Sequence, residues 1–109
     1  MRKASVLYKN EEAGILTQLD NGSFTFRYHD DWHTAVNKPP ISLTLPKSNQ
    51  IYSSSHLFPF FYNMLPEGTN KQNVCFKLRI DKNDHFGLLL QTAKNDTIGA
   101  IRIIKIEGS

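Results

Sequence analysis

A chain of 109 residues, with 13 basic and 10 acidic side chains and a net charge of +3, is long enough for one domain with one modest core. Hydrophobic residues make up 39% and charged residues 21%, which excludes an intrinsically disordered chain. The basic residues are scattered, with no run longer than Arg2-Lys3, and so lack the concentrated stripe typical of nucleic-acid-binding proteins. We therefore expect a single domain over residues 1–109 and no direct nucleic-acid partner.

Cysteine usage and hydropathy narrow the setting further. Cys75 is the only cysteine, so the chain has neither an internal disulfide framework nor a cysteine-based zinc site. No apolar run approaches the roughly 20 residues needed to cross a bilayer, and no apolar stretch follows Arg2-Lys3 as in a signal peptide. The expected location is the cytoplasm, without a membrane partner.

The first third of the chain predicts three antiparallel strands. β-Forming side chains cluster in residues 4–9 and 14–19, and residues 24–28 alternate aromatic with polar side chains, as in a strand with one buried face. Asn21-Gly22 lies between the second and third strands, and this pair tolerates the positive φ angles of a tight hairpin turn. The pattern indicates a meander.

The middle of the chain predicts less regular structure. Residues 29–33 indicate a turn with a short helical segment, and the two prolines that follow at 39–40 favour an extended path. Residues 41–45 alternate again and are closed by Pro46, which predicts an edge strand. The polar, serine-rich residues 47–55 are expected to form a surface loop.

The second half changes to helical patterns. Residues 57–65 are nearly all apolar, Pro59 suits a first helical turn, and Pro66 ends the predicted helix. Thr69, followed three residues later by Gln72, forms a capping box that opens a second helix.

This second helix places its apolar side chains on one face, and these are Val74, Cys75 and Leu78. Asp84 is expected to cap a third helix, and the isoleucine-rich residues 98–106 to form a closing strand. Strands followed by helices and a last strand predict an α+β domain, with a small antiparallel sheet packed against two to three short helices.

The chain offers little for catalysis. Asp30, Asp31 and His33 surround Trp32, and we interpret them as a polar turn anchored by the indole, since four neighbouring residues rarely converge on one point. The four histidines lack metal-binding spacing, Cys75 lies on an apolar helix face, and no phosphate-binding loop or nucleophile elbow is present. We expect no catalytic residue, no cofactor and no metal, and hence no enzyme.

The apolar stretch 57–65 is better suited to binding a protein. A helix buries only part of its circumference, so nine successive residues with a single strongly polar member cannot all face inward. Phe58, Phe61 and Leu65 share one face, whereas Tyr62 and Met64 point elsewhere. An exposed aromatic ring beside a methionine is typical of protein-binding surfaces.

The run P-F-F-Y-N-M-L-P-E-G at 59–68 resembles the P-F-F-x-N-L-L-P-E-G signature of the N-terminal subdomain of HipA-type kinases. Residues 40–46 resemble the P-x-S-L-S-L-P segment of that family, and residues 96–101 its D-x-x-G-A-V stretch. The resemblance also includes the opening hairpins and covers nearly the whole chain.

The resemblance implies a function in trans. In HipA proteins a kinase core with the ATP and magnesium residues follows this subdomain, whereas here the chain stops at Ser109. That arrangement resembles the HipS proteins of three-component toxin–antitoxin systems, which neutralise a HipA-like serine/threonine kinase toxin, HipT, together with a DNA-binding HipB. The residues expected to contact the kinase are Tyr62, Asn63, Met64, Leu65, Pro66 and Glu67.

Two alternatives stay open at this point. The chain could be the non-catalytic subunit of a split HipA-like kinase, required for its activity, and the sequence does not supply the sign of the effect. It could also be a small basic nucleic-acid-binding protein that stacks bases on its aromatic rings, which predicts strongly salt-dependent binding to nucleic acid.

Overall fold

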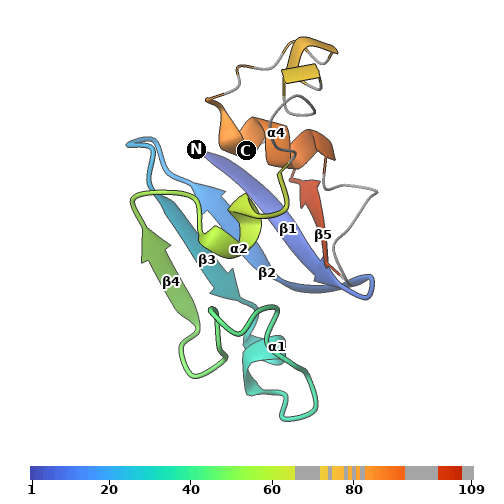
Figure 1. Ribbon diagram of the computed structural model, residues 1–109. Coiled ribbons are helices and arrows are strands. Elements are labelled where there is room, and N and C mark those ends of the chain that lie inside the picture. The colour runs from blue at the N-terminus through green and yellow to red at the C-terminus, as the bar shows by residue number, and fades with distance from the viewer. Residues whose placement is uncertain are drawn as a thin grey trace.

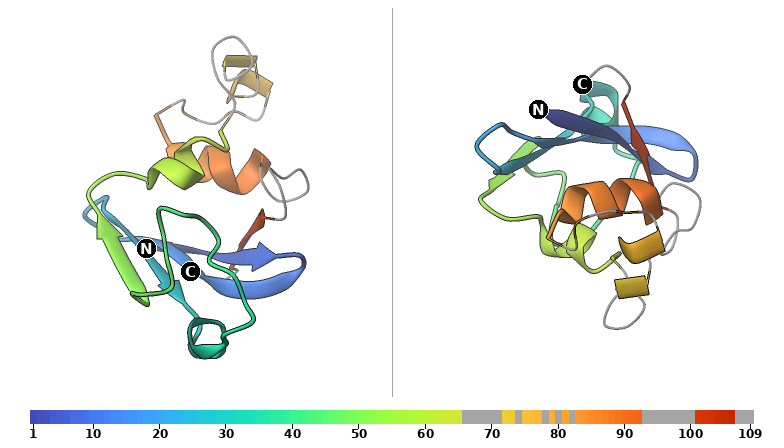
Figure 2. Two further views of the ribbon diagram at one scale, coloured as in Figure 1. Left: turned by 60° about the horizontal axis from the view of Figure 1, so that its bottom comes forward. Right: turned by 90° about the horizontal axis from the view of Figure 1, so that it is seen from above.

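The computed structural model describes residues 1–65, 72–73, 75–77, 79, 81, 83–92 and 101–106. In these residues, a five-stranded antiparallel sheet has the order β4-β3-β2-β1-β5, and helices α2 and α4 pack on one of its faces (Figures 1 and 2). The strands are β1 (Arg2–Tyr8), β2 (Glu11–Gln18), β3 (Phe24–Tyr28), β4 (Ile51–Ser54) and β5 (Ile101–Lys105). The helices are α1 (Asp30–Thr34), α2 (Pro59–Tyr62) and α4 (His85–Thr92). The predicted α+β class is confirmed.

The meander of β1, β2 and β3 forms as its sequence predicts. Gly22 takes a φ of +88° in the β2–β3 turn, and its N–H donates to the Leu19 carbonyl at 2.9 Å. The β1–β2 turn is formed by Lys9 and Asn10, both with positive φ, so β2 begins at Glu11, ahead of the strand segment predicted at residues 14–19. Two hairpins therefore build the first three strands.

The closing strand lies beside the first one. Strand β5 pairs antiparallel with β1, from Ala4 opposite Lys105 to Tyr8 opposite Ile101. This confirms the predicted C-terminal strand for residues 101–105, while residues 98–100 lie outside the described part. The sheet thus joins the two ends of the sequence.

The fourth strand is not the one that the alternation predicts. Residues 41–45 are not a strand, and the edge strand β4 is formed instead by Ile51–Ser54, which was expected to be part of a surface loop. Its serines occupy an outer edge, where one side of the strand is not paired within the sheet. Phe26 lies opposite Tyr52, whose ring packs against the core and supplies the apolar side of this strand.

Residues 41–45 alternate between apolar and polar side chains because they form a loop whose two ends face the core. Ile41 and Leu45 are buried, whereas Leu43 is 94% exposed. The buried Tyr28 hydroxyl accepts a hydrogen bond from the Ile41 N–H at 3.1 Å and donates one to the Leu45 carbonyl. Burial also raises the pKa of Tyr28 to about 12, so its hydroxyl stays protonated.

The core lies between the sheet and helices α2 and α4. Phe26 on β3 contacts Phe61 on α2, with ring centroids 5.9 Å apart, and Phe24 stacks on Phe86 of α4 at 6.1 Å. Cys75 is buried in the same cluster, as its predicted apolar helix face requires. Residues 72–73 and 75–77 are helical, but Thr69, Val74 and Leu78 lie outside the described residues. No helix in the described ranges is long and apolar enough to span a bilayer.

Candidate functional site

Helix α2 ends at Tyr62, the first of the predicted contact residues, and the next three, Asn63 to Leu65, follow it directly in the chain. Pro59 occupies its first turn as predicted, and the Asn63 N–H donates to the Pro59 carbonyl at 2.9 Å. The next two N–H groups, of Met64 and Leu65, donate to carbonyls only three residues back, at 3.1 Å each. The helix therefore ends at Tyr62, and the rest of the predicted helical segment continues as tight turns.

The two faces of this segment separate as its sequence predicts. Phe58, Phe61 and Leu65 are buried, and Phe61 has no exposed surface. Tyr62 is 44% exposed, and Met64 is half-buried against the core. A rigid apolar base thus presents an aromatic ring to solvent.

The structure brings the first four predicted contact residues together without testing what they bind. Tyr62 and Asn63 are exposed, Met64 is half-buried, and Leu65 is only 7% exposed, so Leu65 supports the segment from within. Pro66 and Glu67 lie outside the described residues. We call Tyr62, Asn63 and Met64 the α2 patch.

The Tyr62 ring is held from the side by helix α4. Its centroid lies 5.2 Å from that of His85, and the two rings meet at 88°, an edge-to-face arrangement. Such ring pairs contribute about 0.5–1.5 kcal/mol beyond the area they bury. His85 therefore restricts the orientation of an otherwise exposed tyrosine.

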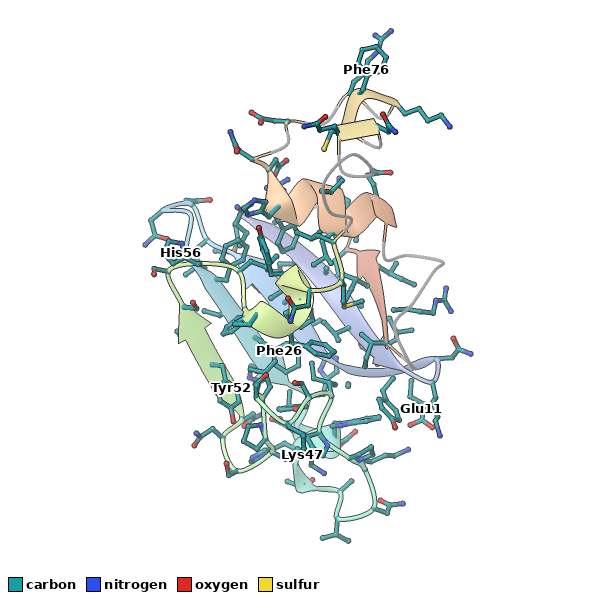
Figure 3. All side chains as sticks on the ribbon, viewed as in Figure 1. Glu11, Phe26, Lys47, Tyr52, His56 and Phe76 are labelled. Carbon is teal, nitrogen blue, oxygen red and sulfur yellow. The ribbon has the colours of Figure 1, made fainter. Side chains whose placement is uncertain are left out.

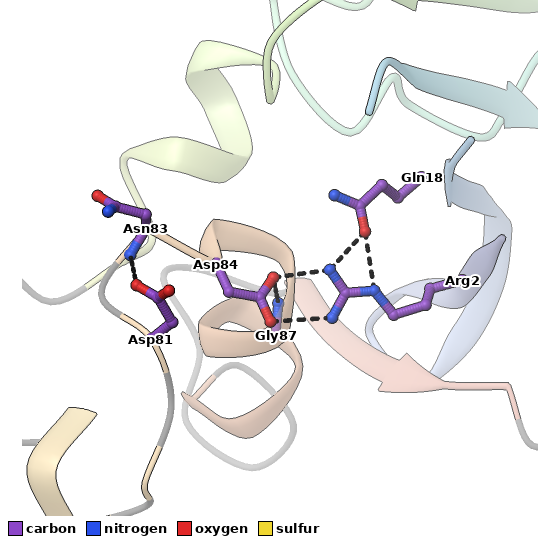
Figure 4. A network of polar contacts seen from close by, with 6 residues as sticks. All are labelled: Arg2, Gln18, Asp81, Asn83, Asp84 and Gly87. Atoms are coloured by element: carbon purple, nitrogen blue, oxygen red, sulfur yellow. Dashed lines mark hydrogen bonds and ion pairs between the residues drawn. The ribbon is translucent and has the colours of Figure 1, made fainter. Parts of the chain in front are cut away.

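Helix α4 is in turn fixed to the sheet through Asp84 and Arg2 (Figure 4). Asp84 caps the helix as predicted, since its Oδ1 accepts from the Gly87 N–H at 3.1 Å. Arg2 donates to both carboxylate oxygens, at 2.6 and 3.1 Å, and also to the Gln18 side-chain oxygen. The hydrogen bond from Arg2 holds the pKa of Asp84 below its usual value. The sequence separation of 82 residues hid this pair from sequence analysis.

A hollow of about 370 Å³ opens beside Tyr62, and we call it the α2–α4 hollow. It is lined by polar side chains from β2, from the segment after β4, and from both helices: Gln18, Ser55, His56, Tyr62, Asn83 and His85. None except Tyr62 was a sequence candidate, because only the fold brings these segments together.

A second hollow, of about 550 Å³, lies by helix α1, and we call it the charged hollow. Its side chains are Glu11, Glu12, Arg27, His29, Asp30, Asp31, Trp32 and Lys38. Most of its charges are paired with one another: Arg27 with Asp30 at 2.9 Å, Lys38 with Glu11, and His29 with Glu12. The Nε2 atom of His29 and the Oε2 atom of Glu12 lie 2.9 Å apart without the alignment of a hydrogen bond, and they form an ion pair when the imidazole is protonated.

The Asp30–His33 segment beside this hollow lies in helix α1, the short helical segment that its sequence predicts. Trp32 is buried and its Nε1–H donates to the Pro39 carbonyl at 2.9 Å. A hydrogen bond from Gln50 and the charge of Arg27 lower the pKa of Asp30. Over the described residues, no three metal-ligating side chains converge on one point.

Comparison with known proteins supplies the family. The HipA N-terminal domain family matches residues 4–104. The chain belongs to this family. A solved structure described as the N-terminal domain of HipA toxin superimposes with a TM-score of 0.75 at 30% identity, covering 100% of this chain and 96% of that one.

Two relatives carry this HipA N-terminal domain in different settings. An uncharacterized protein of Haemophilus influenzae is 33% identical over 103 residues, which cover 94% of this chain and 92% of that protein. The putative kinase Y4mE of Sinorhizobium fredii is 28% identical over 104 residues, and this chain spans only 24% of its length. The similarity is to the N-terminal, non-catalytic domain of HipA, and it connects the chain with HipA-like kinase systems.

The structure also explains the start of the family-like run at 59–68. Pro59 begins helix α2, Phe61 fills the core, and Phe60 packs on Phe61 at 5.2 Å. These residues are needed to hold the helix on the sheet. Tyr62 is the first aromatic residue of the run that is exposed, and packing on the core does not account for its exposed ring.

Proposed function

We propose that this HipA N-terminal domain acts as an antitoxin of the HipS type. It binds a HipA-like serine/threonine kinase toxin, HipT, and inhibits it, and a HipB-like DNA-binding protein completes the complex. The domain itself contributes no catalytic group and no cofactor, and it acts in the cytoplasm.

One observation carries this proposal. The same domain makes up about a quarter of a putative kinase, Y4mE, and nearly the whole of the Haemophilus influenzae relative. A domain that packs against a kinase core in one chain has a surface complementary to that core. The same surface on a separate chain binds such a core in trans, provided that the core lacks its own copy.

The α2 patch is the surface best suited to this contact. Tyr62 is an exposed aromatic residue on a buried apolar base, and binding hot spots are enriched in tyrosine, tryptophan and arginine. A kinase needs an accessible nucleotide pocket and aligned catalytic groups. A small domain docked near that cleft inhibits the kinase either by filling the substrate site or by holding one lobe misaligned.

The experiment that tests the proposal fixes the sign of the effect. A purified HipA-like kinase without its own N-terminal subdomain is assayed for autophosphorylation with increasing amounts of this chain. Inhibition that saturates at a fixed molar ratio supports the antitoxin function. Stimulation would establish the split-kinase alternative, and no binding at all would contradict both.

A further inference from the structure

The α2–α4 hollow is lined by groups that can donate hydrogen bonds. The described residues that line it include two imidazoles, two side-chain amides and two hydroxyls, and none of them is a carboxylate, a lysine or an arginine. The charged hollow differs, because it has four carboxylates and most of its charges are paired internally. The α2–α4 hollow is therefore suited to a single negative group.

Gln18 has a fixed orientation in this lining. Arg2 donates from Nε, at 2.8 Å, and from Nη2 to the Gln18 Oε1 atom. A guanidinium can only donate, so the amide oxygen must face Arg2 and the amide nitrogen must point away from it (Figure 4). That nitrogen makes no hydrogen bond to any residue that the structure describes. Arg2 thus orients a donor that has no acceptor within the described fold.

The nearby carboxylate of Asp84 does not compete for these donors. One of its oxygens accepts from Arg2 and from the Gly87 N–H, and the other accepts from Arg2. The Tyr62 hydroxyl, a further donor in the lining, makes no hydrogen bond to the described residues. Gln18 and Tyr62, from different elements, thus both line the hollow, and neither donor has an acceptor among the described residues.

We propose that the α2–α4 hollow receives a carboxylate side chain, glutamate or aspartate, of the kinase that docks on the α2 patch. This inference rests on the proposed function. A phosphate group carries close to two negative charges at neutral pH and a carboxylate carries one, so a described lining of neutral amide, imidazole and hydroxyl groups, without arginine or lysine, suits the carboxylate better. The contact would fix the register of the kinase relative to Tyr62.

Gln18→Glu is the decisive variant. The carboxylate of this variant still accepts hydrogen bonds from Arg2, so the contact between these two positions is kept. A negatively charged oxygen, however, replaces the amide donor that points away from Arg2. Affinity for the kinase, measured by isothermal titration calorimetry, should fall at least about tenfold because the introduced carboxylate repels the carboxylate of the kinase. Gln91→Glu, the same change at an exposed site on α4 outside the hollow, should leave affinity unchanged within a factor of two. Equal affinities for the two variants would overturn the inference.

A second arm tests the hollow without the kinase. Sodium acetate is titrated into the ¹⁵N-labelled chain at constant ionic strength, with sodium chloride as the reference. In the unsubstituted chain, the NMR signal of the Gln18 side-chain amide should shift saturably with acetate. In Gln18→Glu, the amide signals of the other residues that line the hollow should not shift. If the kinase fails to bind, the proposed function fails. The acetate titration then tests the carboxylate site alone, and absence of a saturable shift overturns that site. Loss of binding after phosphatase treatment of the kinase would also overturn the carboxylate assignment.

Discussion

The two hollows lie at different ends of the sheet and use their polar side chains in different ways. Figure 3 shows Glu11, which lines the charged hollow, well separated from His56, which lines the α2–α4 hollow. In the charged hollow, acids and bases neutralise one another and Trp32 anchors the turn. In the α2–α4 hollow, donors surround an exposed aromatic ring and carboxylates are missing from the described lining.

Internal pairing of charges separates a structural polar cluster from a surface suited to a partner. The larger hollow, at about 550 Å³, has the denser set of titratable groups, yet most of its charges are paired within the fold. The cores of protein–protein interfaces are depleted of charge and enriched in aromatic residues. The smaller hollow and the α2 patch meet that description.

The base of the α2 patch gives the largest expected effect. Phe61→Ala removes a fully buried ring that contacts Phe26 and Phe60, and large-to-small changes of this kind cost about 3–5 kcal/mol. Urea unfolding followed by circular dichroism measures the loss. Phe61→Leu, which keeps more volume, should remain folded and lose less. A loss below about 1 kcal/mol for Phe61→Ala would contradict the assigned core.

The hydrogen bonds between Tyr28 on β3 and the loop at residues 41–45 give the next largest expected effect on stability. Tyr28→Phe removes the hydroxyl that bridges Ile41 and Leu45, and it leaves the buried Ile41 N–H without an acceptor. Leaving one buried polar group unpaired costs about 1–3 kcal/mol. The free energy of unfolding should fall by that amount. Affinity for the kinase should stay within a factor of two, since Tyr28 lies outside the α2 patch and the α2–α4 hollow.

The cap of helix α4 gives an effect of about 1 kcal/mol that depends on pH. Asp84→Ala removes the helix cap and the Arg2 pair, and an N-cap is worth about 1 kcal/mol. Because the folded chain lowers the pKa of Asp84 below 3.8, this stability is present above pH 3.8 and is lost as the pH falls through the lowered value. The difference in unfolding free energy between wild type and variant should therefore shrink in acid. A difference that grows in acid would contradict the pairing.

The charged hollow gives the smallest effect. Glu12→Gln removes the partly exposed carboxylate beside His29, and surface ion pairs contribute about 0–1 kcal/mol even when both groups are charged. Stability should change by less than about 1 kcal/mol, and kinase affinity by less than a factor of two, measured by urea unfolding and calorimetry. A tenfold loss of affinity would show that the kinase contacts the charged hollow, and it would contradict the assignment of this hollow as a structural cluster.

Much of the fold could be predicted because its signals are local. Alternating aromatic residues in β3, Asn21-Gly22 in the turn, Pro59 at the start of α2 and Asp84 at the start of α4 each act within a few residues of themselves. The face of α2 also followed from helical geometry, since Phe58, Phe61 and Leu65 lie three or four residues apart.

The sequence-based predictions that were wrong concern residues whose structure depends on partners far away in the sequence. Residues 41–45 alternate like a strand, but Tyr28 holds their two buried ends in a loop, and the serine-rich β4 takes the place beside β3. The lining of the α2–α4 hollow and the Arg2–Asp84 pair bring together residues far apart in sequence. No local pattern marks such a site.

A comparison of two exposed aromatic residues tests whether Tyr62 anchors a HipA-like kinase. Phe76 is 88% exposed and lies at the tip beyond α4, away from helix α2 (Figure 3). Affinities for the kinase are measured for Tyr62→Ala and Phe76→Ala, with circular dichroism to establish that both variants fold. We predict a loss of at least about 2 kcal/mol for Tyr62→Ala and a change below about 0.5 kcal/mol for Phe76→Ala. Unchanged affinity in a folded Tyr62→Ala variant would contradict this prediction.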